Sequence, residues 1–302
     1  MNVEELLEAA RLLPDSPGRF PDGGQYRVEI PSVEGADTAE LVLDTAAELG
    51  VPVHRISQGS GISLLTDAEI TRYAKLGVER AVEVCLFVGP RAPWDGAAAS
   101  ALTPDGGNVG WRHAGLRSLL AAREDVRRAA GLGIRSVLIA DEGLASLITA
   151  DKEAGVLPPG LVVKASALLG IANPVGAALL AGLGVDSLNI AADTPFGDLA
   201  AYRAATPAFL DLYIEAPDGL GGFIRYHDQG EIVRLAAPVY LKFGLRNAPG
   251  IYPAGEHLRG VIRGSAVERV RRAQVGLEHL GRQYPDAVMS PRGADTRGIP
   301  EP

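Results

Sequence analysis

Two lysines lie inside apolar runs of the sequence, where a charge is unexpected. Lys164 is set in Leu-Val-Val-Lys-Ala-Ser and Lys242 in Val-Tyr-Leu-Lys-Phe-Gly. Only four of the 29 basic residues are lysines, so arginine serves almost everywhere a surface cation is needed. A buried lysine loses its proton more readily than arginine, and the neutral amine can attack a carbonyl to form a Schiff base. We expect Lys164 to form this imine and Lys242 to lower the pKa of Lys164 or to hold a substrate oxygen.

Three glutamates, Glu29, Glu83 and Glu215, lie in other apolar runs. They could be general acid–base groups tuned by the lysines. They could also be oxygen ligands of Mg²⁺ or Mn²⁺, together with His54. The sequence has no HxH or HExxH spacing. We therefore expect no metal or other cofactor, and a divalent metal remains the alternative.

Further polar residues are candidates for binding the substrate. In the run 51–58, His54 and Gln58 share one face of a strand and Arg55 takes the other, and the alternation leaves open which face points inward. Asn189 ends another apolar run. The turn at Gly221 and Gly222 and the nearby Arg246 could hold a phosphate or carboxylate, whereas a Gly-Gly pair can also simply form a tight turn. Each of these residues is predicted to bind substrate.

Short apolar runs alternate with longer amphipathic segments along most of the chain. The expected strands are 26–33, 51–58, 80–88, 136–140, 161–167, 187–191, 209–216 and 238–245. The expected helices lie between them, and several end in a Leu-Gly pair just before the next strand, which is a helix C-cap. Eight such units predict a parallel sheet that closes as a single (β/α)8 TIM barrel. An open doubly wound sheet would need a glycine-rich fingerprint after its first strand, and Pro31–Gly35 is not one.

The barrel is expected to occupy residues 26–283. Residues 1–25 would be an N-terminal helical extension with a helix over 3–13, and residues 284–302, rich in proline, glycine and charge, a flexible tail. The longest loop, 89–113 after the third strand, carries Trp94 and Trp111. A loop of this length on the catalytic face is typical of a lid or binding loop, although a packed decoration or an oligomer contact is the alternative.

Composition excludes several classes of protein. The only cysteine, Cys85, rules out an intrachain disulfide framework, an all-cysteine zinc site and a cysteine-ligated iron–sulfur cluster. The net charge of −8 argues against nucleic acid or an anionic membrane as partner. The sequence contains no long apolar span, and its first residues are acidic where a signal peptide would be basic. We expect a cytoplasmic protein that binds a small molecule and could form a homo-oligomer.

Two short segments resemble known families. Val162-Val-Lys164-Ala-Ser166 is similar to the Schiff-base lysine strand of deoxyribose-phosphate-aldolase-like class I aldolases. In that family the second lysine lies on the adjacent strand and a Gly-Gly-x-Arg motif binds phosphate, and this sequence departs from both features. The segment 240–246, Tyr-Leu-Lys-Phe-Gly-Leu-Arg, resembles bacterial barrels of the peptidase-U32 type, whose clustered cysteines are missing here. The resemblances imply a barrel enzyme and assign no residue.

The sequence as a whole predicts a barrel enzyme for a small anionic carbonyl or sugar-like metabolite. Nearly every strand carries a polar or ionisable residue toward its carboxyl end, which is where barrel enzymes have their active sites, and we favour lyase or aldolase chemistry there. A divalent-metal isomerase or epimerase is the second hypothesis. A U32-peptidase-like or non-catalytic binding barrel is the third, and a flat mouth or lysine–glutamate pairs that neutralise each other would favour a non-catalytic barrel.

Overall fold

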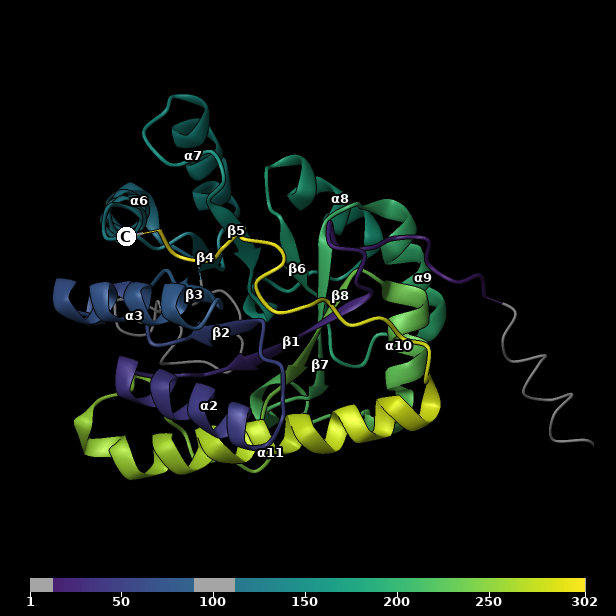
Figure 1. Ribbon diagram of the computed structural model, residues 1–302. Helices are drawn as coiled ribbons and strands as arrows, with labels where there is room; N and C mark the ends of the chain where they lie inside the picture. Colours follow the sequence, from purple (N-terminus) through teal and green to yellow (C-terminus); the bar gives the residue numbers. More distant parts are fainter. Residues whose placement is uncertain (1–12, 90–111, 302) are drawn as a thin grey trace, which may run out of the picture.

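A computed structural model describes residues 13–89 and 112–301, and its centre is a closed barrel of parallel strands (Figure 1). The strands pair in sequence order, and β1 pairs with β8 to close the ring. Their bounds are β1 (Tyr26–Pro31), β2 (Arg55–Gln58), β3 (Glu83–Phe87), β4 (Ser136–Ile139), β5 (Val162–Ala165), β6 (Ser187–Asn189), β7 (Phe209–Glu215) and β8 (Val239–Phe243). The predicted single (β/α)8 TIM barrel is confirmed.

The helices lie outside the barrel, one or more after each strand. Their bounds are α2 (Ala36–Glu48), α3 (Asp67–Glu79), α6 (Gly115–Gly131), α7 (Glu142–Glu153), α8 (Pro174–Gly182), α9 (Phe196–Ala205), α10 (Gln229–Ala236) and α11 (Arg259–Gln283). Local sequence starts several of them. Thr66 and Glu69 form a capping box on α3, and Asn173 caps α8 with Pro174 in the first turn. The long α11 lies beside α2 in Figure 1, across the β8–β1 side of the barrel.

The hydrophobic core lies between the strands and the helices, not inside the barrel. Valine, isoleucine and leucine alternate outward along the strands and form one large buried cluster with the helices. The inward positions are mostly polar, and the strand register stacks them in layers of four. From the amino-terminal ends of the strands, called the lower end below, toward their carboxyl ends, three of these layers follow one another. They are Arg55, Ser136, Ser187 and Tyr240; Glu29, Cys85, Lys164 and Asp211; and Ser57, Leu138, Asn189 and Lys242.

Residues 284–301, for which composition predicts a loose tail, run across the lower end of the barrel (Figure 1, yellow). Met289 bridges to Tyr26 of β1, and the Ser290 hydroxyl accepts a hydrogen bond from Arg27 at 3.1 Å. Asp295 forms an ion pair with the same arginine at 3.1 Å. The guanidinium of Arg27 is buried, so it is stable only with polar partners, and Ser290 and Asp295 of the tail are two of them. These contacts hold the tail against the lower end of the barrel.

His54 joins this tail to the first strand. Its Nδ1 accepts a hydrogen bond from the Val28 amide at 3.0 Å, so its Nε2 must carry the proton and donate it to the Ser290 carbonyl at 2.7 Å. The neutral ring satisfies both contacts. A second proton, on Nδ1, would face the Val28 N–H. Burial accordingly lowers the pKa of His54 from 6.5 to about 4.

We expect this histidine to make the fold sensitive to mild acid. The unfolded chain binds a proton near pH 6.5 and the folded chain only near pH 4, so stability is present above pH 6.5 and falls between these values. The expected loss is about 3 kcal/mol. Urea unfolding at pH 7 and pH 4 should show that loss in the parent and in the exposed-site control His257→Gln, but not in His54→Gln. Equal pH dependence in all three proteins would contradict this interpretation.

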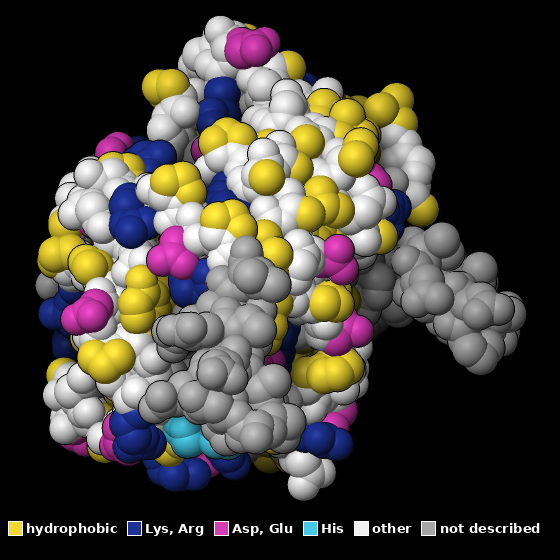
Figure 2. All heavy atoms as spheres, turned by 90° about the vertical axis from the view of Figure 1, so that its right-hand side faces the viewer, with side chains coloured by type: hydrophobic (Ala, Val, Ile, Leu, Met, Phe, Trp, Pro, Cys, Tyr) yellow, Lys and Arg dark blue, Asp and Glu magenta, His cyan; other side chains and the backbone are white. Residues whose placement is uncertain are grey.

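Two expected features fall outside the described residues: the helix over residues 3–13, apart from its last residue, and nearly all of the 89–113 loop with Trp94 and Trp111. Within the described residues, no helix is both long and apolar enough to cross a membrane. Figure 2 shows a face on which hydrophobic side chains gather in the upper part among charged ones. On α8, Val175 and Leu179 are exposed. The homo-oligomer remains a prediction.

Candidate active site

A pocket of about 370 Å³ opens at the carboxyl ends of the strands, where barrel enzymes hold their substrates. The loops after β1, β2, β5, β7 and β8 form its walls. Its volume is at the small end of the range for small-molecule sites. Apolar groups form much of its surface, and several polar residues also line it: Ser32, Ser57, Gln58, Ser166, Asn189, Tyr213, Asp218, Lys242, Tyr252 and Arg269.

A network of buried charges fills the barrel directly below this pocket. Lys164 forms an ion pair with Glu29 and lies 3.6 Å from Asp211. Arg55 reaches the same two carboxylates from below, at 3.2 Å from Glu29 and 2.9 Å from Asp211. All four side chains are essentially inaccessible to solvent. The carboxylates of the network neutralise the charge of Lys164 and hold its Nζ below the pocket, so this lysine does not line the pocket.

Lys242 is the lysine that lines the pocket. Its Nζ lies 3.4 Å from the second oxygen of Glu29 and 4.3 Å from the centre of the Tyr213 ring. Ser57 also lines the pocket and donates a hydrogen bond to the same Glu29 oxygen at 2.7 Å. Glu29 thus connects the two lysines, and Ser57 and Lys242 connect Glu29 to the pocket.

The pKa values of these groups follow from burial and from one another. Burial alone would raise the pKa of Glu29, but the charges of Lys164, Lys242 and Arg55 outweigh it and hold that pKa well below its usual value. Burial lowers the pKa of Lys164, against the opposing effect of Asp211 and Glu29. Burial raises the pKa of Cys85 to about 12, so this thiol is not a ready nucleophile.

Glu83, Arg55 and His54 belong to the lower part of the barrel. Glu83 is the first residue of β3, accepts hydrogen bonds from Ser136 and Tyr240, and lies 2.8 Å from Arg55. Arg55, the first residue of β2, points into the barrel. His54 faces the tail. Arg55 and Glu83 stand at the amino-terminal ends of their strands, and only residues near the carboxyl ends reach the pocket.

Glu215, Arg246 and the glycine pair meet beside the mouth without lining the pocket. Glu215 accepts hydrogen bonds from the Tyr226 hydroxyl at 2.6 Å and from the Arg246 amide at 2.9 Å, because a bulge in β7 turns it away from the interior. The side chain of Arg246 is 55% exposed and lies 3.5 Å from Asp218. Gly221 and Gly222 have φ angles of 97° and 65°, which identifies them as turn residues.

Gln58 and Asn189 do line the pocket. Gln58 also holds the turn at Gly61 through its side-chain amide. Within the described residues, the buried Oδ1 of Asn189 has no hydrogen-bond partner. An unsatisfied buried acceptor is costly, so a donor on a bound ligand would stabilise it. Of the predicted binding residues, Asn189 has the placement that fits this role best.

Several important residues were missed by the sequence analysis. Asp211, Ser187 and Tyr240 complete the buried network, and Ser57 and Tyr213 contact both the network and the pocket. The period-two rule applied along the strands from the predicted residues Arg55, Asn189 and Lys242 reaches Ser57, Ser187 and Tyr240, and Asp211 and Tyr213 share one face of β7. Arg269 comes from the middle of α11, and no strand pattern points to it.

Glu29, Glu83, Glu215 and His54, the residues considered as metal ligands, are held in four different surroundings. Arg55 separates Glu29 from Glu83, and the other two face away from the barrel interior. Among residues 13–89 and 112–301, no group of three or more histidine, cysteine, aspartate or glutamate side chains is arranged to hold a metal.

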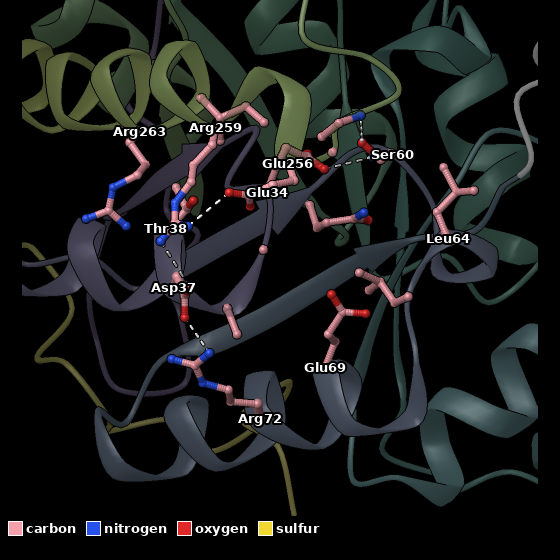
Figure 3. A pocket seen from close by; sticks show the side chains of 17 residues that line it. Glu34, Asp37, Thr38, Ser60, Leu64, Glu69, Arg72, Glu256, Arg259 and Arg263 are labelled. Atoms are coloured by element: carbon pink, nitrogen blue, oxygen red, sulfur yellow. Dashed lines mark hydrogen bonds and ion pairs between the residues drawn. The ribbon is translucent and has the colours of Figure 1, made fainter.

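A second pocket of about 250 Å³ lies outside the barrel, between the starts of α2 and α11 and one side of α3 (Figure 3). Its charges mostly satisfy one another. Arg72 pairs with Asp37, as Figure 3 shows, and Arg259 pairs with Glu256 at 3.0 Å. Glu34, on its inner side, accepts hydrogen bonds from the amides of Gly59 and Ser60. The charged side chains of this pocket are therefore mostly engaged in ion pairs with one another, and the pocket is separate from the one at the carboxyl ends of the strands.

No protein-family model matches this chain, and no curated protein matches its sequence. Solved structures do share its fold. A putative fructose-1,6-biphosphate aldolase from Coccidioides immitis has a TM-score of 0.52 at 11% identity, over 87% of this chain and 92% of the aldolase.

More distant matches include a U32 peptidase, with a TM-score of 0.42 at 17% identity over 66% of this chain and 73% of the peptidase. A putative lyase/mutase from Burkholderia cenocepacia has a TM-score of 0.46 at 14% identity, over 93% and 88% of the two chains. The matches are consistent with the weak resemblance to aldolase-like and U32-like barrels. At 11% identity, the aldolase match shows the TIM-barrel fold alone.

Proposed function

We propose that this protein is an enzyme of the lyase or aldolase type, acting on a small carbonyl compound through an imine at Lys242. The observation that supports the proposal is the position of Lys242, which is the one lysine among the described residues that lines the mouth pocket. The expectation from sequence gave the imine to Lys164. Its complete burial and its pairing with Glu29 and Asp211 favour a supporting role for it instead.

The chemistry begins when Lys242, after giving its proton to pocket water, attacks the carbonyl carbon. The carbonyl oxygen leaves as water, and the protonated imine then accepts the electron pair of a neighbouring C–H or C–C bond as that bond breaks. Ser57 lines the pocket and donates its hydroxyl proton to Glu29, so its oxygen is held where it can accept a hydrogen bond from the substrate, and the proton of the broken bond leaves to pocket water. Protonation of the resulting enamine and attack by water on the imine release the product and restore the lysine.

The buried cations have a separate task in this scheme. Lys164 and Arg55 keep Glu29 ionised between turnovers, and they balance the carboxylates that surround them. Tyr213 covers the Lys242 ammonium with its ring and shields it from bulk water. Asn189 would accept a hydrogen bond from a substrate hydroxyl.

A non-catalytic binding barrel is the second candidate, and the neutralised Lys164–Glu29 pair favours it. The hollow mouth with its own lysine favours an enzyme. The divalent-metal isomerase stays a further alternative, with a different requirement for metal.

Proton exchange in D₂O tests the proposal against these alternatives. We expect the enzyme to exchange the hydrogens next to the carbonyl of small oxo acids or sugar phosphates, as followed by NMR, with and without EDTA. Exchange that is unaffected by EDTA and lost in Lys242→Met supports imine chemistry. Exchange that EDTA abolishes would favour the metal isomerase, and no exchange with any tested compound would favour a binding barrel.

A further inference from the structure

Arg269 is a buried cation at the mouth pocket, and it forms no ion pair with a carboxylate in the described part of the chain. It lies in the middle of α11, and its side chain reaches the pocket from the β1–β8 side. Only 4% of the residue is exposed. Within residues 13–89 and 112–301, no aspartate or glutamate lies within ion-pairing distance of its guanidinium.

The hydrogen bonds of Arg269 leave one edge of the guanidinium unused. Nη1 donates to the Ser32 carbonyl at 3.3 Å. Nε is buried without a hydrogen-bond partner in the described part of the chain, and no hydrogen bond of Nη2 to a described residue is found. The Nε–Nη2 edge is the side of arginine that presents two parallel N–H groups.

The other buried arginines of the barrel are arranged differently. Arg55 meets Glu29, Glu83 and Asp211, and Arg27 meets Asp22 and Asp295. Both of these buried guanidinium groups therefore have carboxylate partners. Burial lowers the pKa of Arg269, and the charges of Tyr252, Tyr213 and Glu34 offset that effect only in part.

We propose that Arg269 binds the carboxylate of the substrate through its Nε–Nη2 edge. The inference rests on the proposed function only in taking the mouth pocket as the substrate site. It replaces Arg246 as the anion-binding residue, because the Arg246 side chain is half exposed, is close to Asp218 and does not line the pocket.

The surroundings of Arg269 favour a carboxylate over a phosphate. A planar carboxylate matches two parallel N–H donors and carries one charge, which one guanidinium neutralises. The pocket offers one other cation, Lys242, which the imine requires. The remaining walls are largely apolar: Phe87, Leu138, Leu168, Leu220, Leu245 and Ile251. These features together specify an amphipathic oxo acid, with a carboxylate at Arg269 and its carbonyl at Lys242.

Calorimetric titration of the full chain tests this assignment with 2-oxohexanoate and its methyl ester as matched probes. We expect the acid to bind at least about 10-fold more tightly than the ester. Arg269→Gln should weaken binding of the acid by about 10- to 100-fold and leave binding of the ester unchanged. Arg269→Lys, which keeps the charge without the two-point contact, should recover only part of the affinity, and the exposed-site control Arg271→Gln should match the parent.

Each other result overturns the assignment. Arg269 does not bind the substrate carboxylate if the acid and the ester bind with equal affinity, or if neither binds. The same conclusion follows if a folded Arg269→Gln binds the acid as tightly as the parent. If Arg269→Gln fails to fold, Arg269→Lys decides by the same comparison. Tighter, Arg269-dependent binding of dihydroxyacetone phosphate than of the acid would assign the site to phosphate instead.

The same variants separate this inference from the proposed function. Binding that depends on Arg269, without proton exchange, would keep the carboxylate site and remove the imine chemistry. Proton exchange that is independent of Arg269 would keep the imine chemistry and remove the carboxylate site.

Discussion

Replacing Glu29 by glutamine is expected to lower the free energy of unfolding by about 3–5 kcal/mol. Glu29 accepts from Ser57 and pairs with Lys164, Arg55 and Lys242 in a region closed to water. An amide of the same shape leaves those cations with one buried carboxylate fewer, and desolvated charge without compensation is strongly destabilising. Urea unfolding of Glu29→Gln measures the loss directly.

Two variants show whether charge balance is the cause. Glu40→Gln removes a half-exposed carboxylate that pairs with Arg72, and it should cost less than about 1 kcal/mol. Lys164→Met in the Glu29→Gln background removes a charge of opposite sign, so the double variant should be more stable than the two single losses added together predict. Additive losses, or a Glu29→Gln protein within about 1 kcal/mol of the parent, would contradict a charge-balanced network.

The second large effect separates the two lysines. Lys242→Met should reduce proton exchange by about a thousandfold or more, since it removes the attacking amine. The fold should tolerate it, because Glu29 retains Lys164 and Arg55 as partners. Lys164→Met should instead lower the free energy of unfolding by about 3–5 kcal/mol, because it leaves Glu29 and Asp211 short of one buried cation.

The exposed Lys75 supplies the control for both lysines. Lys75→Met should match the parent in proton exchange and in urea unfolding. If Lys164→Met is stable and loses exchange while Lys242→Met keeps it, Lys164 and not Lys242 forms the imine.

The barrel could be predicted from sequence because its signals are local. Alternating valine and isoleucine, the Leu-Gly helix ends and the caps at Thr66 and Asn173 each specify one strand or helix, and eight units leave few ways to close a sheet. The inward direction of Arg55, left open by the sequence, follows from the register of β2 with β1 and β3. In this orientation Arg55 forms ion pairs with Glu29, Glu83 and Asp211 on other strands, and such pairs join residues far apart in the chain.

The site was harder to predict because depth along a strand decides what a polar residue can reach. Lys164 and Lys242 look alike in sequence, yet one lies in the middle of the barrel and the other at the pocket floor. Glu83 opens its strand and so belongs to the lower end. The composition of residues 284–302 predicts a loose tail, and composition carries no information about the contacts of Arg27 with Ser290 and Asp295.

Borohydride reduction in the presence of small carbonyl metabolites, followed by intact mass measurement and peptide mapping, tests the central claim most directly. Reduction fixes an imine as a stable secondary amine, so the added mass identifies the bound compound and the peptide identifies the lysine. We expect one adduct, on Lys242, which disappears in Lys242→Met and persists in Lys75→Met. A folded protein that gives no adduct with any metabolite, or an adduct on Lys164 alone, would contradict the assignment of the imine to Lys242.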